Sequence, residues 1–92
     1  MLNYVMEVEN KRSAVYDGDK EVGRCTYIEN ADSWDLNSNV VDPDYRGQGI
    51  ARKLVDVIAD HARENDIKLA ASCPYVVNLF ENKKEEYEDV IL

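Results

Sequence analysis

Segments of the first 41 residues alternate between apolar and polar positions, weakly over residues 4–9 and clearly over 21–29, which is the pattern of half-buried β-strands. The alternation predicts strands over residues 4–9, 13–16, 21–29 and 33–41. Asp17-Gly18 is typical of a hairpin turn. In the third strand the period of two places Val22, Arg24, Thr26 and Ile28 on one face and Gly23, Cys25 and Tyr27 on the other. In the fourth strand it predicts one shared face for Trp34, Leu36, Ser38 and Val40.

The second half of the chain begins with a helical pattern. Apolar residues recur at the spacing of one helix face, at Ile50, Leu54, Val57, Ile58 and Ala62. This pattern predicts a helix over residues 49–65, followed by a short strand over 68–72, a helix from Pro74 and a terminal helix over 85–92. The order of elements predicts an α+β fold, a mostly antiparallel mixed sheet of about five strands with helices packed on it.

Length and composition indicate one small domain over residues 1–92. The chain has 92 residues, of which 45% are hydrophobic, enough for a single core. No apolar run approaches the ~20 residues of a membrane span, and the first residues lack the pattern of a signal peptide. We therefore expect a cytoplasmic protein with no membrane partner, in which Cys25 and Cys73 are free thiols.

The charge balance is acidic. Nineteen Asp and Glu residues oppose 11 Lys and Arg residues, giving a formal net charge of −8. Nucleic-acid surfaces need basic patches, so we expect no nucleic-acid partner. Acidity is compatible with a cationic substrate such as an amine, and it also serves solubility alone. We expect no metal site, and the sequence indicates no particular oligomeric state.

The most informative segment is Tyr45-Arg46-Gly47-Gln48-Gly49-Ile50-Ala51, a glycine-rich turn between a predicted strand and a predicted helix. Its glycines let the main chain approach a ligand, and the first N–H groups of a helix have no intrahelical partner. Arg46, Arg52 and Lys53 add positive charge around this turn. The segment lacks the Lys-Ser/Thr pair of a P-loop and the third glycine of a dinucleotide fingerprint. It predicts an anion site, with a simple turn as the alternative.

These residues resemble a known family. The run from Val40-Val41 through Arg46, Gly49 and Ala51 is similar to the Gln/Arg-x-x-Gly-x-Gly/Ala loop of the GNAT superfamily of N-acetyltransferases. Cys73-Pro74-Tyr75 and a terminal Glu-Tyr-x-Asp-Val resemble a very short subgroup of that family. The resemblance implies acetyl-CoA or coenzyme A as cofactor and a small-molecule or protein amine as substrate. The implied cofactor-binding residues are Val41, Arg46, Gly47, Gln48, Gly49, Ile50, Ala51 and Asn78.

The resemblance leaves the chemistry open. Cys73 precedes a predicted helix whose free N–H groups favour a thiolate, so it is a candidate nucleophile or acid, with a buried apolar role as the alternative. Members of the short subgroup usually carry His-Thr where this chain has Ser38-Asn39. Ser38 is therefore the second candidate catalytic position, although serine is no general base at neutral pH. The only histidine, His61, is predicted to lie on the surface, far along the long helix. An N-acetyltransferase is the first hypothesis, and a coenzyme A-binding module with little activity is the second.

Overall fold

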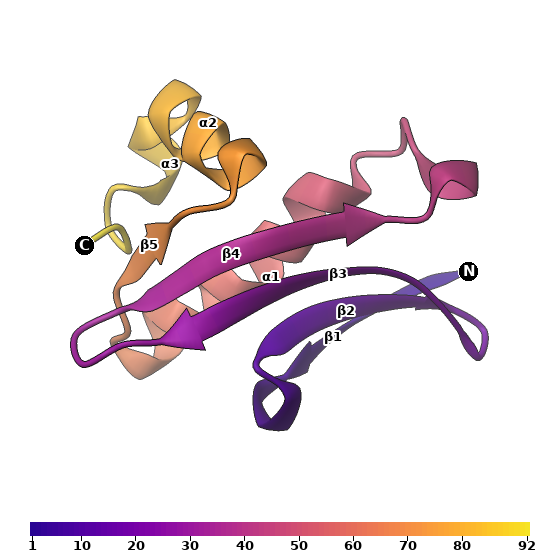
Figure 1. Ribbon diagram of the computed structural model, residues 1–92, viewed down its shortest axis with the longest axis horizontal. Coiled ribbons are helices and arrows are strands. Elements are labelled where there is room, and N and C mark those ends of the chain that lie inside the picture. The colour runs from indigo at the N-terminus through magenta and orange to yellow at the C-terminus, as the bar shows by residue number, and fades with distance from the viewer.

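A computed structural model describes all residues, 1–92, and its centre is a five-stranded mixed sheet (Figure 1). The strands are β1 (Leu2–Glu7), β2 (Arg12–Asp17), β3 (Lys20–Glu29), β4 (Trp34–Val41) and β5 (Leu69–Ala71), in that order across the sheet. Neighbouring strands from β1 to β4 are antiparallel, and β5 is parallel to β4. The predicted α+β fold is confirmed.

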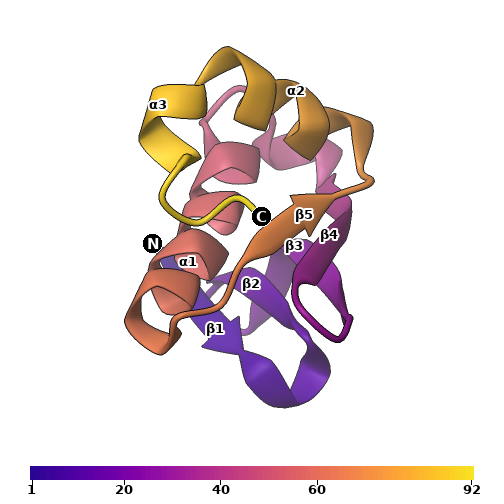
Figure 2. The same ribbon diagram turned by 90° about the vertical axis from the view of Figure 1, so that its left-hand side faces the viewer.

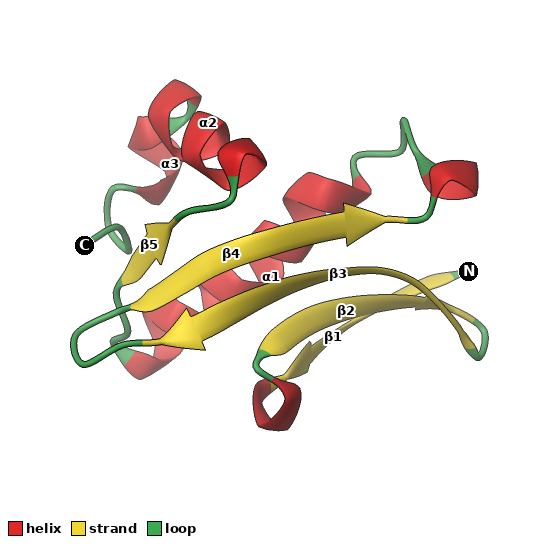
Figure 3. Cartoon of the chain, viewed as in Figure 1, coloured by secondary structure: helices red, strands yellow, loops and turns green.

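Three helices and two short 3₁₀ segments complete the chain (Figure 3). The helices are α1 (Ile50–Asn65), α2 (Pro74–Asn82) and α3 (Lys84–Tyr87), and the 3₁₀ segments are η1 (Val8–Asn10) and η2 (Pro43–Tyr45). Helix α1 ends where Asp66 takes a left-handed conformation, with φ 56°. Pro74 begins α2, where its missing N–H leaves no hydrogen bond unmade.

Helix α1 lies against one face of the sheet, and α2 and α3 lie beside it near β5 (Figures 1 and 2). One core of 18 buried residues fills the space between them, and it includes Leu54 and Ile58 of α1, Leu36 of β4 and Phe80 of α2. Burial of these side chains supplies the main driving force of folding. The opposite face of β1–β4 carries no helix, as the front of Figure 1 shows.

Two β-bulges change which side chains share a face. In the β2–β3 pairing, Val15 lies opposite Gly23 and Tyr16 opposite Glu21, so Val22 is the extra residue. Val22 is therefore buried together with Gly23, and the prediction that it shares a face with Arg24 is wrong. The alternation of Arg24, Cys25, Thr26 and Tyr27 beyond it is confirmed.

The second bulge lies in β4, where Tyr27 pairs with Leu36 and Thr26 pairs with Ser38, so that Asn37 is the extra residue. Beyond it the alternation of β4 is reversed. Trp34 and Leu36 point into the core, whereas Ser38 and Val40 lie on the face without a helix. The predicted common face of these four residues is wrong, because period-two reasoning assumes an unbroken ladder.

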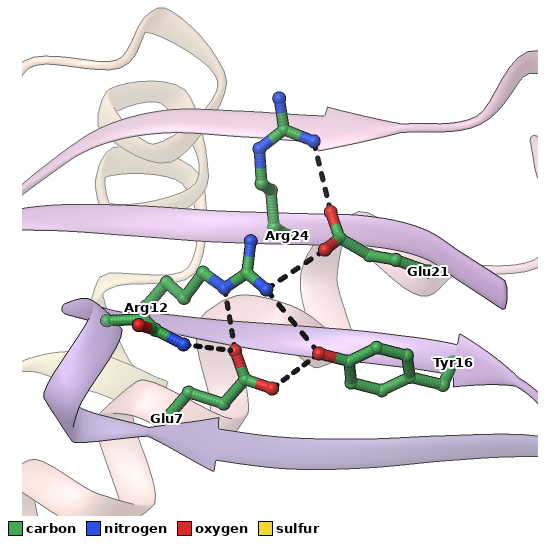
Figure 4. Close-up of polar contacts among 6 residues, drawn as sticks. Glu7, Arg12, Tyr16, Glu21 and Arg24 are labelled. Atoms are coloured by element: carbon green, nitrogen blue, oxygen red, sulfur yellow. Dashed lines mark hydrogen bonds and ion pairs between the residues drawn. The ribbon is translucent and has the colours of Figure 1, made fainter. Parts of the chain in front are cut away.

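Charged side chains cover part of the helix-free face over β1–β3 (Figure 4). The Glu7 carboxylate accepts from the Tyr16 hydroxyl at 2.5 Å and from Arg12 Nε at 2.7 Å. Arg12 also contacts Glu21 at 2.9 Å, and Glu21 contacts Arg24 at 3.1 Å. The hydrogen bonds from Tyr16 and Arg12 lower the pKa of Glu7. Because these charged groups pair with one another, this part of the face needs no binding partner to neutralise them.

Three other expectations differ from the structure. The first strand ends at Glu7 rather than at residue 9, because η1 begins the turn to β2. The predicted helix over 85–92 is the shorter α3, after which Ile91 bridges to Leu69 at the edge of β5. His61 is half-buried and stacks on Trp34, with ring centroids 5.7 Å apart.

No helix has the length and apolar character needed to cross a membrane.

Candidate functional site

Strands β4 and β5 separate after a short paired stretch. Only residues 34–36 of β4 pair with β5, and the N–H groups of Ser72 and Cys73 then both donate to the Leu36 carbonyl, each at 3.1 Å. The chain turns away there into α2, while β4 continues to Val41 (Figure 1). Residues 37–41 therefore present backbone N–H and C=O groups along an edge with no neighbouring strand.

A cleft of about 490 Å³ lies beside this edge. Three parts of the chain line it: the end of β4, the loop with the first turn of α1, and the first turn of α2. The lining residues are Asn39, Val40, Val41, Tyr45, Arg46, Gly47, Gly49, Ile50, Ala51, Arg52 and Tyr75. Six of the eight predicted cofactor-binding residues thus lie together, whereas Gln48 and Asn78 are exposed outside the lining.

The loop before α1 is built to leave backbone donors free. Gly47 and Gly49 have φ values of 82° and 74°, a left-handed region that favours glycine. Gly49 is the N-cap of α1, so no side chain caps the helix, and its first turn contains no acidic residue. The first N–H groups of α1 and its dipole therefore stay available to an anion from outside.

Side chains fix the start of this loop. The Asp42 carboxylate accepts from the N–H of Asp44 at 2.9 Å, which closes the turn after β4. The Tyr45 hydroxyl donates to Asp17 at 2.6 Å and so ties the loop to the hairpin between β2 and β3. These two hydrogen bonds hold the loop at the end that follows β4. Gly47 and Gly49 lie further along the loop, beyond these contacts.

Sequence reasoning missed the contributions of Asn39, Arg52 and Tyr75 to the cleft. The bulge at Asn37 turns Asn39 toward α1, where its Nδ2 donates to the Ala51 carbonyl at 3.0 Å. Tyr75, 41% exposed, reaches the cleft from α2, and burial raises its pKa. Arg52 was visible in the sequence only as part of the basic segment around the loop. The bulge depends on strand pairing, and Tyr75 comes from a helix much later in the chain. Neither is marked by a local pattern in the sequence.

The two predicted catalytic residues are placed differently. Cys73 is the N-cap residue of α2, is 7% exposed and contacts the core beside the point where β4 and β5 separate. Ser38 lies opposite Thr26 on the helix-free face, outside the cleft lining. Cys25 is fully buried, and burial raises its pKa to about 12. His61 lies against Trp34 rather than beside Cys73. The structure thus shows no Cys–His pair.

The cleft chemistry fits the cofactor that the sequence resemblance implies. One end has Arg46, Arg52 and the free amides of α1, which suit phosphate groups. The other end has the unpaired edge of β4, whose alternating donors and acceptors suit an extended chain with amide groups. Coenzyme A combines a pyrophosphate with such an arm. An added Cβ at Gly47 or Gly49 would meet no atom within 4 Å, so the space before the loop is open.

Comparisons with known proteins agree with this geometry. The family model for GCN5-related N-acetyl-transferases matches residues 4–90. A GCN5-like protein from Staphylococcus aureus, proposed to be an N-acetyltransferase, is 26% identical, with a TM-score of 0.75 over 98% of this chain and 87% of that one. Among curated proteins, no relative matches the chain.

Two larger structures share the fold. A ribosomal-protein-alanine N-acetyltransferase from Brucella melitensis is 26% identical, with a TM-score of 0.62 over 88% of this chain and 62% of that one. N-acetylglutamate synthase from Neisseria gonorrhoeae, solved with coenzyme A and N-acetyl-glutamate, is 20% identical, with a TM-score of 0.67 over 87% of this chain and 22% of that one. The family match over nearly the whole chain, on a fold shared with these proteins, shows that this protein belongs to the GCN5-related N-acetyltransferase family.

Proposed function

We propose that the protein is an acetyl-CoA-dependent N-acetyltransferase that acts on an amine. The observation that carries the proposal is the joining of two features in one cleft: the uncapped N-terminus of α1 and the unpaired edge of β4. The first suits the pyrophosphate of the coenzyme, and the second suits its pantetheine arm. Family membership supports the same assignment.

Each part of the cleft has a defined task in this proposal. Arg46 and the amides from Gly49 to Ala51 bind the pyrophosphate, and the main chain near Val41 bonds the arm. Asn39 holds β4 against the first turn of α1 through the Ala51 carbonyl, which keeps these two parts in register. When bound, acetyl-CoA supplies an acetyl group activated as a thioester. The protein contributes mainly by positioning it against the amine.

Cys73, which lies near the point where β4 and β5 separate, is the candidate residue for a direct role in acetyl transfer. An attacking amine forms a C–N bond to the acetyl carbon as the C–S bond breaks, and the departing thiolate needs a proton. The thiol of Cys73 can donate it, after which the Cys73 thiolate takes up the proton that the amine nitrogen releases. Alternatively, the Cys73 sulfur accepts the acetyl group first while its own proton passes to the departing thiolate, and the amine then takes the acetyl group from Cys73. The second candidate function, a coenzyme A-binding module, is favoured by Ser38, since a serine on the other face cannot act as a base for Cys73.

Titration with acetyl-CoA tests the proposed function. We expect binding with a dissociation constant between about 1 μM and 1 mM. The largest changes in amide chemical shift should fall on residues 41–52, because these residues carry the loop, the first turn of α1 and the end of β4. Shifts at α2 should be confined to its first turn, near Tyr75. An unshifted loop at millimolar ligand would rule out a coenzyme A site in this cleft.

Thiol reactivity tests the role of Cys73. Cys73 should be alkylated by iodoacetamide faster than Cys25 at neutral pH, because the pKa of the fully buried Cys25 is raised to about 12. Bound acetyl-CoA should slow the alkylation of Cys73. Mass spectrometry of peptides measures both rates. If Cys73→Ala keeps full transfer to an amine, direct attack by the amine replaces any covalent role for this residue.

Both cysteines are free, and neither is paired with the other. Unpaired cysteines are ordinary in reducing compartments and uncommon in secreted small domains. This supports the cytoplasm as the place where the protein acts.

A further inference from the structure

Arg52 faces two sites at once. It lies in the first turn of α1 and lines the cleft, and it also lines a neighbouring hollow between α1 and α3, together with Asp56, Glu86 and Tyr87. Its guanidinium is paired with the Glu86 carboxylate, and its Nε lies 3.9 Å from Asp56 Oδ2. The Tyr87 ring centroid is 6.0 Å from the guanidinium carbon. One cation is thus shared between the cleft and the C-terminal helix.

Building on the proposed function, we propose that Arg52 is a phosphate-binding residue of the cleft and that Glu86 holds it in an ion pair until the coenzyme binds. Arg52 and Glu86 are 36% and 45% exposed, so water screens the pair and the pair contributes little stability. The phosphate oxygens accept two parallel N–H bonds from a guanidinium, and the pyrophosphate of coenzyme A as a whole carries two negative charges where a carboxylate carries one. The phosphate can therefore replace Glu86 as the partner of Arg52.

The exchange requires side-chain movement only. Without the Glu86 carboxylate, α3 is still held by the Tyr87 hydroxyl, which donates to Asp56 at 2.5 Å. Arg63 adds two contacts, to the Asp89 carboxylate at 2.6 Å and to the backbone carbonyl of Glu86 at 2.8 Å. Asp56 keeps Tyr87 as its partner when Arg52 leaves. The C-terminal segment thus remains docked in both arrangements.

Arg46 provides the contrast. It is exposed on the loop, and none of the ion pairs of the structure includes it, so its charge is available to a ligand at all times. Arg52 becomes available only when Glu86 gives it up. Glu86 is therefore a positioning residue that lowers the affinity for coenzyme, although it lies on α3 and does not line the cleft itself.

Calorimetric titration with coenzyme A tests this in a mutant cycle. Glu86→Gln should tighten binding by about threefold or more, and Arg52→Gln should weaken it by about tenfold. In the Arg52→Gln background, Glu86→Gln should change the dissociation constant by less than about twofold, since the guanidinium with which Glu86 pairs is absent. Glu85→Gln is the matched control, because it removes the same charge from the same helix without a contact to Arg52. It should leave the affinity unchanged.

A second measurement follows the side chain directly. In the wild-type protein, coenzyme A should shift the ¹⁵N–Hε signal of Arg52, and Glu86→Gln should shift it before any ligand is added. If coenzyme A binds normally but Glu86→Gln changes nothing, or Glu85→Gln acts equally, the inference is wrong while the proposed function stands. An effect of Glu86→Gln that persists without Arg52 also overturns it, in favour of direct repulsion. If no folded variant binds coenzyme A, the proposed function fails and this inference fails with it.

Discussion

Replacing Gly49 with valine should weaken coenzyme A binding by more than about tenfold, or about 1.4 kcal/mol, while the domain stays folded. Gly49 has a φ of 74°, where a residue with a Cβ is strained by roughly 1–2 kcal/mol. Relief of that strain would turn the first amides of α1 away from their present direction. The new side chain would also occupy the open space before the loop, where the pyrophosphate is expected.

Gly18→Val is the control for this experiment. Gly18 has a φ of 63° in the hairpin between β2 and β3, and an added Cβ there also meets no atom within 4 Å. It should therefore cost similar stability without touching the cleft. Calorimetry gives the affinities, and thermal unfolding gives the stabilities. Equal affinity in Gly49→Val and the wild type would mean that the ligand binds elsewhere on the protein.

The sequence predicted those features of the fold that depend on local spacing. The amphipathic pattern from Ile50 predicted the long helix almost to the residue, and the glycine-rich turn that was predicted as an anion site lines the cleft. Both signals lie within one turn or one helix face, where side-chain periodicity follows directly from backbone geometry. The short β5 was also predicted, although only three of its five expected residues form the strand.

The features that were missed depend on contacts between distant segments. The bulge at Asn37 is set by the pairing of β4 with β3, and no residue type marks it. Because of this bulge, Asn39 rather than Ser38 lines the cleft. This difference changes the interpretation of the site more than any other. The C-terminal prediction failed for a related reason: the Leu69 N–H donates to the Val90 carbonyl and the Leu92 N–H to the Leu69 carbonyl, so the tail pairs with β5 instead of continuing a helix.

Replacing Gly23 with valine should destabilise the domain by about 2–3 kcal/mol, the cost of overpacking a filled core. Gly23 lies on β3 directly under α1. A Cβ there would be 3.1 Å from Val15 Cγ1 and from the Val40 carbonyl oxygen, and 3.3 Å from Leu54 Cδ1. Two further methyl groups have no space unless α1 moves away from the sheet. In a domain of this size the loss should lower the melting temperature by roughly 10 °C or more.

The same substitution one residue later is the control. Arg24 is exposed on the helix-free face, where its pair with Glu21 is screened by water, so Arg24→Val should change stability by no more than about 0.5 kcal/mol. Urea unfolding of both variants measures the difference. Because Asn39 ties β4 to the first turn of α1, displacement of α1 in Gly23→Val should also widen the cleft and weaken coenzyme A binding. A Gly23→Val protein as stable as the wild type would contradict the close packing of α1 on β3, and with it the geometry that places the loop beside the edge of β4.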